Sequence, residues 1–255
     1  MSSMTLDLDD RSTYADEYKQ ILYAEDVWSL LEEDFNGRPS ILLQELLSDP
    51  ADIRDPFIKD LHAKCDAVFR ENYSNVITYH ACRILDPEEY FKVGLLTSSR
   101  ERLIAKARGI FAGIQNLDEA IEEADVYFRL YDGSISMYIS ARFAANEYLI
   151  KGSHYLRMVA ANLGSEAEER LSYENDRRKP VFVKCKIPVS WLEDTTNKYS
   201  FLYHYNAFLV RRFIWEKANG QEEYYEPPET LAVFKAIPPE NIESILNPEI
   251  CVNWR

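Results

Sequence analysis

Glycine is scarce in this sequence, with only 8 among 255 residues. Phosphate-binding loops need glycines where the backbone approaches a ligand closely, and neither GxGxxG nor GxxxxGK[ST] occurs. The 4 cysteines lie far apart without a CxxC pair, a spacing typical of neither a zinc ribbon nor a dense disulfide framework. We therefore expect reduced thiols, no bound metal, and no P-loop or Rossmann nucleotide site.

Long apolar runs are also missing. No stretch of about 18 apolar residues occurs, so no segment is predicted to span a membrane. The N-terminal residues lack the basic start and the apolar centre of a signal peptide. These observations predict a cytoplasmic protein without a membrane partner.

Basic residues are outnumbered, 29 against 43 acidic ones, which gives a formal net charge of -14. That charge disfavours binding nucleic acid by neutralising phosphates over a wide surface, although a local basic groove stays open as an alternative. Residues 1–70 hold 16 acidic and 7 basic side chains, a net of -9. The front of the chain is thus its more acidic part.

The chain has a helical pattern at its front and a sheet-rich pattern in its last third. From about residue 14 to 72 apolar residues recur at helical spacing, broken by prolines, which predicts several short helices. Asp86-Pro87 predicts a helix start, because aspartate caps and proline suits the first turn, and Gly94 predicts its end. Further helices are predicted over 100–111, 117–127 and 141–161. Strands are predicted over 75–80, 133–140, 181–187, 201–213 and 229–237.

This order of elements favours an α+β fold over alternating βαβ units. We expect two parts, an acidic helical extension at residues 1–73 and a second domain at residues 74–255.

The first group of chemically capable residues ends a predicted strand. It contains His80, Cys82 and Arg83. A strand end is a position from which side chains reach a cleft, so His80 is a candidate site residue; the alternative is a structural histidine that hydrogen-bonds at the strand terminus. A metal pair of His80 and Cys82 lacks two further ligands at any standard spacing.

Two tyrosines form the second group. Tyr138 lies on a predicted strand and Tyr148 in the helix expected after it, so both rings can face one slot. Two aromatic rings can sandwich a planar ligand by offset stacking. The alternative is that both tyrosines pack in the core or at its rim.

The third feature is Glu229, which opens a predicted apolar strand. A carboxylate at such a place can hold a sugar hydroxyl and stabilise positive charge that develops on a ribose as its bond to a leaving group breaks. The alternative is a solvated glutamate at a strand start.

Together these three groups resemble the His-Tyr-Glu branch of the ADP-ribosyltransferase superfamily, the branch of diphtheria toxin and the poly-ADP-ribose polymerases. The text from Tyr79 to Arg83, with Gly94-Leu95 downstream, is similar to the family's opening motif. Residues 137–148 are similar to its strand-to-helix motif, and residues 229–242 to its last strand and turn. The resemblance covers roughly residues 74–248.

The resemblance implies a split, two-sheet α+β core that binds NAD+ as a substrate in an extended pocket, without a metal. By this correspondence His80 hydrogen-bonds the nicotinamide ribose, while Tyr138 and Tyr148 bracket the nicotinamide ring. Glu229 would orient the ribose and support an oxocarbenium-like transition state. Arg83 is the candidate for the diphosphate, as a bidentate donor.

The function that the resemblance implies is NAD+-dependent ADP-ribosyl transfer to an intracellular macromolecule, a protein or a nucleic acid, as in a toxin or a defence effector. Pro227 stands where arginine-modifying relatives carry a second glutamate, which disfavours arginine as the target. The alternatives among enzymes are an NAD+ glycohydrolase and an RNA 2'-phosphotransferase, of which the acidic balance disfavours the latter. The alternative of another class is a non-catalytic interaction protein. In the ADP-ribosyltransferase interpretation, residues 1–73 are a helical extension that would cover the pocket, recruit a target, or bind a neutralising or regulatory protein.

Overall fold

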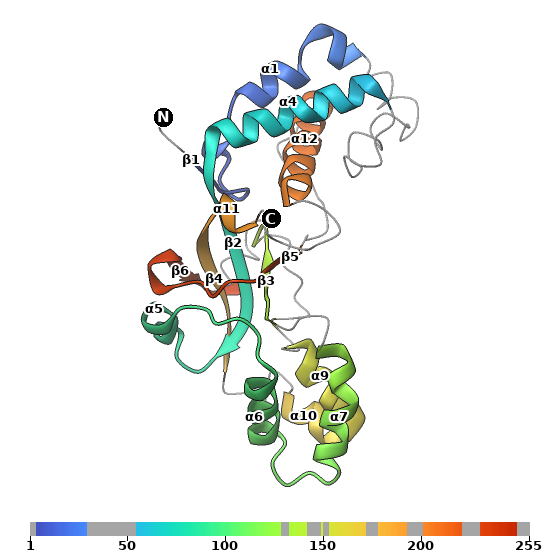
Figure 1. Ribbon diagram of the computed structural model, residues 1–255, viewed down its shortest axis with the longest axis vertical. Coiled ribbons are helices and arrows are strands. Elements are labelled where there is room, and N and C mark those ends of the chain that lie inside the picture. The colour runs from blue at the N-terminus through green and yellow to red at the C-terminus, as the bar shows by residue number, and fades with distance from the viewer. Residues whose placement is uncertain are drawn as a thin grey trace. The chain divides into compact units, whose positions relative to one another are not determined.

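The computed structural model describes residues 4–29, 55–128, 133–141, 149, 153–171, 178–192, 201–220 and 230–248 (Figure 1). It combines helices with a mixed β-sheet, which confirms the α+β class. The chain divides into two compact units, Met1–Ile77 with Pro188–Glu229 and Thr78–Ile187 with Thr230–Arg255. The sequence suggested one boundary after residue 73, and that functional division stays a prediction. Among the described helices, none is long and apolar enough to cross a membrane.

Three helices form the body of the first unit. They are α1 (Glu17–Leu22), α4 (Pro56–Asn72) and α12 (Phe201–Asn219), and each contacts the other two. Helix α4 begins as a local rule predicts, because the Asp55 carboxylate accepts from the Phe57 N–H at 2.8 Å and Pro56 occupies the first turn. Strand β1 (Met4–Leu6), which the sequence did not reveal, pairs in parallel with the start of β2 (Tyr73–Ile84).

Helix α12 corrects the predicted strand at residues 201–213. Its many aromatic and branched residues are typical of strands, and they prompted that prediction. The buried side chains of Tyr205, Leu209 and Phe213 instead recur every four residues, the spacing of one helix face. Phe213 stacks on Tyr18 of α1 with ring centroids 6.0 Å apart. Burial of the helix against α1 and α4 therefore outweighs the local strand preference.

A buried polar chain links the same three helices. The Tyr18 hydroxyl donates to Asn206 Oδ1 at 2.8 Å, and the Asn206 amide donates to the Asp66 carboxylate. His62 Nδ1 lies 3.7 Å from the other oxygen of Asp66. Burial raises the pKa of Asp66, while His62 and the Asn206 hydrogen bond act in the opposite direction. The ionised carboxylate is thus less favoured in the folded state than in water.

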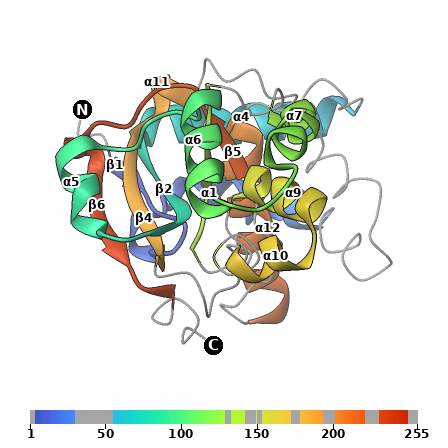
Figure 2. The same ribbon diagram turned by 90° about the horizontal axis from the view of Figure 1, so that it is seen from below.

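The second unit is organised around the sheet, in the order β5-β3-β2-β4-β6. Its strands besides β2 are β3 (Ile135–Tyr138), β4 (Lys179–Pro188), β5 (Thr230–Val233) and β6 (Ile242–Leu246). The pairs β2–β3, β3–β5 and β4–β6 are antiparallel, and β4 lies beside β2 (Figures 1 and 2). The predicted strands at 75–80, 133–140 and 181–187 are confirmed. The one predicted over 229–237 is shorter, since β5 ends at Val233.

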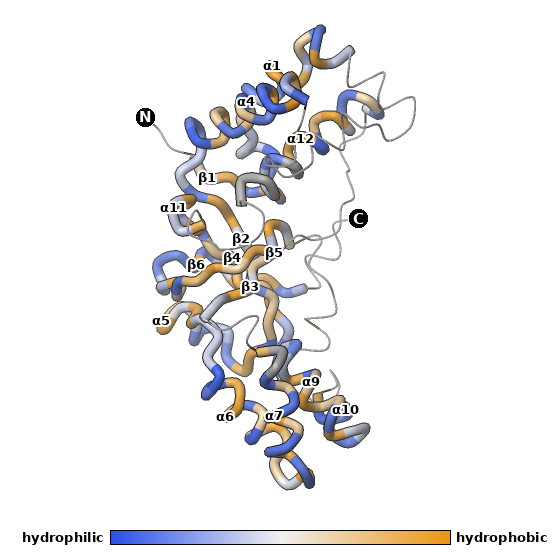
Figure 3. The backbone as a smooth tube through the Cα atoms, turned by 45° about the vertical axis from the view of Figure 1, so that its right-hand side comes forward, coloured by the Kyte–Doolittle hydropathy of each residue, from blue (hydrophilic) through white to orange (hydrophobic). Residues whose placement is uncertain are grey.

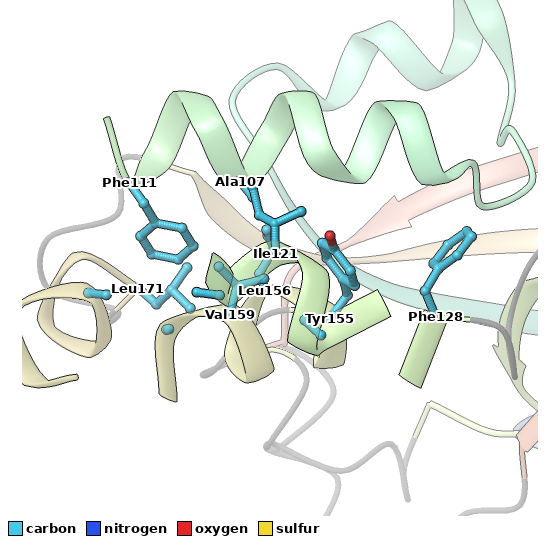
Figure 4. Close-up of a cluster of buried hydrophobic side chains, with 12 residues drawn as sticks. Ala107, Phe111, Ile121, Phe128, Tyr155, Leu156, Val159 and Leu171 are labelled. Carbon is cyan, nitrogen blue, oxygen red and sulfur yellow. The ribbon is translucent and has the colours of Figure 1, made fainter. Parts of the chain in front are cut away.

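Four helices of the second unit share a core (Figure 4). They are α6 (Arg100–Ile110), α7 (Leu117–Phe128), α9 (His154–Leu163) and α10 (Ser165–Leu171). Phe111, Ile121 and Leu156 are almost fully buried in this cluster. The first two helices are confirmed, but one continuous helix over 141–161 is wrong. Ser153 has an extended backbone, with ψ of 135°, so α9 begins only after it.

The segment after β2 matches its predicted boundaries. A 3-10 turn (Pro87–Glu89) leads into the short helix α5 (Tyr90–Val93), and Gly94 ends it with φ of +74°. A Cβ at Gly94 would lie 2.2 Å from the Ile237 carbonyl oxygen, so only glycine fits. The next residue, Leu95, exchanges two backbone hydrogen bonds of 2.8 Å with Ile237. This bridge fixes the α5 segment to the chain beyond β5.

Candidate active site

The sheet order places the three strands that carry the sequence motifs next to one another. His80 lies in β2 and Tyr138 in β3, while β5 begins at Thr230, one residue after Glu229. Tyr138 pairs with Tyr79 on one side and with Thr230 on the other. Glu229 and Tyr148 themselves lie outside the described residues. The arrangement thus brings motif strands together that are far apart in sequence.

The His80 ring is held in one tautomer. Its Nδ1 lies 3.0 Å from the carbonyl oxygen of Ser136 in β3. A carbonyl can only accept, so Nδ1 carries the proton and donates it to this oxygen. In the neutral ring Nε2 is then left without a proton and acts as an acceptor. The contact therefore orients an acceptor nitrogen at a fixed place beside β3.

The environment of His80 favours this neutral ring. Burial lowers its pKa from the ordinary value of 6.5, the hydrogen bond to Ser136 opposes the shift, and the nearby positive charge of Lys106 lowers it further. At neutral pH the imidazole is thus uncharged. It can accept a hydrogen bond from a hydroxyl group, such as one of a sugar.

Side chains of β2 divide between its two faces. Because neighbouring residues of a strand point to opposite sides, Thr78, His80 and Cys82 share one face, which we call the His80 face. Cys82 Sγ lies 3.2 Å from the hydroxyl oxygen of Tyr90, so helix α5 adjoins this face. Lys106 of α6 acts electrostatically on both His80 and Cys82.

The Cys82 thiol is unsuited to nucleophilic chemistry. Burial raises its pKa to about 11, and the contacts with Tyr90 and Lys106 only partly offset that rise. A thiol that stays protonated at neutral pH is a poor nucleophile. Within the part of the chain that the structure describes, no cluster of three or more His, Cys, Asp or Glu residues could hold a metal ion.

Tyr138 occupies the other face of the sheet. Residues paired directly across an antiparallel ladder point to the same side, so Tyr138 lies on the face of Tyr79, opposite His80. Both rings are buried, at 3% and 2% exposure respectively. The structure therefore brings the strands of His80 and Tyr138 together but not their side chains. The expected stacking of Tyr138 on nicotinamide gains no support from this position.

Arg83 lies on the same face of the sheet as Tyr79, where it donates hydrogen bonds to backbone carbonyls. Its Nε donates to the Leu149 oxygen at 2.7 Å and its Nη1 to the Leu171 oxygen at 2.8 Å. Leu171 is the last residue of α10, so the guanidinium caps the negative end of that helix. With 5% exposure, the side chain has a structural position. The expected contact with a diphosphate gains no support here.

Lys106 and Tyr90 are the neighbours of His80 and Cys82 that the sequence did not reveal. Both come from other elements, α6 and α5, and neither belongs to a recognisable motif. Lys106 lies in an exposed stretch of α6, an ordinary place for a lysine. Its position near His80 depends on how the chain folds and could not be deduced from local patterns.

No family model matches this chain, and neither the comparison with curated proteins nor that with solved structures finds a match.

Proposed function

We propose that this protein is an NAD+-dependent ADP-ribosyltransferase whose reaction takes place on the His80 face of the sheet. The observation that carries the proposal is the adjacency of β2, β3 and β5, through the pairs Tyr79–Tyr138 and Tyr138–Thr230. The sequence resemblance requires its three motifs to converge, and adjacent strands permit that. The fixed acceptor Nε2 of His80 adds independent support.

His80 would bind the nicotinamide ribose. Its Nε2 accepts a hydrogen bond from a ribose hydroxyl, and the Ser136 carbonyl keeps the ring from turning. This role needs a neutral imidazole at the pH of the cell, which the lowered pKa of His80 supplies. His80 therefore positions the sugar and takes no proton during the reaction.

Glu229 would supply the carboxylate. Glu229 directly precedes Thr230, the first residue of β5, and Thr230 pairs with Tyr138 of the neighbouring strand. The carboxylate would stabilise positive charge on the ribose as the bond between its anomeric carbon and the nicotinamide nitrogen breaks. Nicotinamide leaves with the bonding electron pair. A nucleophile of the target then bonds to the anomeric carbon and gives up its proton.

Two residue roles differ from those that the resemblance implied. Lys106 is a better candidate for the diphosphate than Arg83, because Lys106 lies near His80 whereas Arg83 donates to carbonyls on the other face. Tyr138 is buried on the face of the sheet opposite His80. Tyr148 remains the proposed aromatic partner of the nicotinamide ring.

The direct test is incubation of the protein with NAD+ labelled in its adenylate part and a cell lysate. We expect label on a macromolecule with the wild type, and none with Glu229→Ala. Glu240→Ala, which removes an exposed carboxylate of a 3-10 turn, is the matched control and should leave labelling unchanged.

The outcomes separate the alternatives. Release of nicotinamide without a labelled acceptor would identify an NAD+ glycohydrolase. Absence of both NAD+ binding and nicotinamide release would contradict the proposal and favour a non-catalytic interaction protein.

A further inference from the structure

Exposed apolar side chains concentrate in one short segment of the second unit. Among the described residues, the large hydrophobic side chains most open to solvent are Leu85, Phe91, Val93, Leu96 and Phe234. The first four fall within residues 85–96, with exposures of 70%, 38%, 51% and 56%. We call these four the α5 patch, and Figure 3 shows the apolar colouring at α5. A concentration of exposed apolar residues within one short segment favours an interaction surface, whereas single exposed apolar residues are ordinary.

The segment that carries the α5 patch is firmly attached. Tyr90 contacts Cys82 of β2, and Leu95 exchanges backbone hydrogen bonds with Ile237. Leu95 itself is only 3% exposed, although Leu96 beside it is open. The exposed side chains are therefore presented on a fixed backbone. Such a surface binds a partner without first having to become ordered.

The charges within the segment that carries the α5 patch have one predominant sign. Asp86, Glu88 and Glu89 are exposed within the same segment, and Lys92 is the one basic residue among positions 85–96. Interfaces match an apolar centre to an apolar centre and a charged rim to the opposite charge. We propose that the α5 patch docks a basic, apolar segment of a partner polypeptide, in which lysine or arginine residues flank apolar anchors.

Two other occupants fit the charges less well. A second copy of this chain, docked through the same patch, would bring Glu88 and Glu89 toward the same acidic residues of its partner, and like charges at an interface disfavour association. An anionic membrane surface is repelled by the same carboxylates. A basic polypeptide is attracted by them.

The place of the α5 patch gives such a partner access to the His80 face. The contact between Cys82 and Tyr90 joins α5 to the face of β2 that also carries His80. A segment docked on α5 therefore binds to a helix that contacts β2 two residues after His80. This inference goes beyond the proposed function, and its test needs no NAD+, so either can fail without the other.

The probes are three synthetic helical peptides, each labelled with a fluorophore. One carries leucine on one face and lysine on the other, the second has glutamate in place of lysine, and the third has serine in place of leucine. Binding to the full-length protein is measured by fluorescence anisotropy at physiological salt. We expect the leucine–lysine peptide to bind at least about tenfold more tightly than either of the others.

Variants locate the binding. The double variant Val93→Ser, Leu96→Ser should weaken the leucine–lysine peptide by about tenfold. The double variant Glu88→Lys, Glu89→Lys should reverse the preference toward the leucine–glutamate peptide. All of these residues are exposed, so circular dichroism and melting should show folded variants.

A matched control is available in α7, where Glu122 and Glu123 form a second exposed pair of glutamates. The double variant Glu122→Lys, Glu123→Lys changes the net charge equally and should leave the peptide preference intact. The proposal is overturned if this control weakens binding as much as the change at Glu88 and Glu89. It is also overturned if the serine variant binds as wild type does, or if that variant instead abolishes a wild-type dimer in sedimentation or binding to anionic vesicles.

Discussion

Tyr79 lies directly opposite Tyr138 in the antiparallel ladder between β2 and β3. This pairing fixes the sides of the sheet that Tyr138 and His80 take, because it assigns Tyr79 and Tyr138 to one face and His80 to the other. The first face carries Arg83, which donates to the last residue of α10, while the second adjoins α5 and Lys106. The chemistry is thus proposed for the second face alone.

Binding of NAD+ should weaken in acid through His80. Burial lowers its pKa from the ordinary 6.5, so the ring is neutral at pH 7 and above, and in acid Nε2 gains a proton and ceases to accept. Affinity measured by calorimetry should be constant from pH 8 to pH 7 and fall at lower pH. His80→Phe should lose about tenfold at pH 7.5, the equivalent of one hydrogen bond to the ligand. The affinity of the His80→Phe variant for NAD+ should also no longer decrease at low pH. If its affinity decreases at low pH as that of the wild type does, a group other than His80 causes the decrease.

Arg83 should matter for stability rather than for NAD+. Arg83→Met removes the charge and leaves the carbonyls of Leu149 and Leu171 without this donor, so we expect a loss of about 3 kcal/mol in the free energy of unfolding. Urea denaturation measures it. Arg108→Met is the control, since Arg108 makes an exposed ion pair with Asp118, and it should cost less than about 1 kcal/mol.

The same Arg83 variant distinguishes the two roles of the residue. At temperatures where the variant is folded, its affinity for NAD+ should equal that of the wild type. A folded Arg83→Met protein with strongly reduced affinity would restore Arg83 as the diphosphate ligand.

Gly94 and Gly109 should respond in opposite directions to alanine. At Gly94 the added Cβ meets the Ile237 carbonyl and the backbone, with φ of +74° and ψ of -169°, suits glycine alone, so we expect a loss of about 3 kcal/mol or more. Gly109 lies inside α6 with nothing within 4 Å of its Cβ position, and Gly109→Ala should stabilise by about 1 kcal/mol. Thermal melting compares the two. Equal changes in melting temperature for Gly94→Ala and Gly109→Ala would show that the bridge between Leu95 and Ile237 does not constrain the α5 segment.

Asp66 should make stability depend on pH. The pKa of Asp66 is raised in the folded state. Its contribution to the free energy of unfolding is therefore fully present below the pKa of the unfolded chain, and it is lost as the pH rises through the pKa of the folded state. Asp66→Asn keeps an oxygen that accepts from Asn206 and removes the charge. Urea unfolding from pH 4 to pH 7 should show a steeper decline for the wild type than for the variant. Parallel declines would mean that other groups control this range.

Local rules predicted the parts of the fold that depend on neighbouring residues. The helical start at Asp86-Pro87 and the end of α5 at Gly94 were readable because a cap and a positive φ are set within a few positions. Helix α12 was misread because its aromatic composition favours strands, whereas its conformation depends on packing against α1 and α4. The interruption before α9 at Ser153 was also missed.

The candidate site was predictable only in part, for a similar reason. The order of the motifs suggested that their strands meet, and the sheet has them adjacent. The sequence could not reveal that Arg83 donates to Leu149 and Leu171 or that Lys106 lies near His80, since these contacts join residues far apart in the chain. The face of the sheet on which Tyr138 lies depends on the strand register, because a shift of one residue would move its side chain to the other face. No local pattern specifies that register.

The central claim is that NAD+ binds on the His80 face. A crystal structure of the protein soaked with a non-hydrolysable NAD+ analogue tests it most directly. We predict a ribose hydroxyl within hydrogen-bond distance of His80 Nε2, with the Nδ1 contact to Ser136 retained and the diphosphate toward Lys106. An analogue bound against Tyr79 and Arg83 on the opposite face, or none bound at saturating concentration, would contradict the claim.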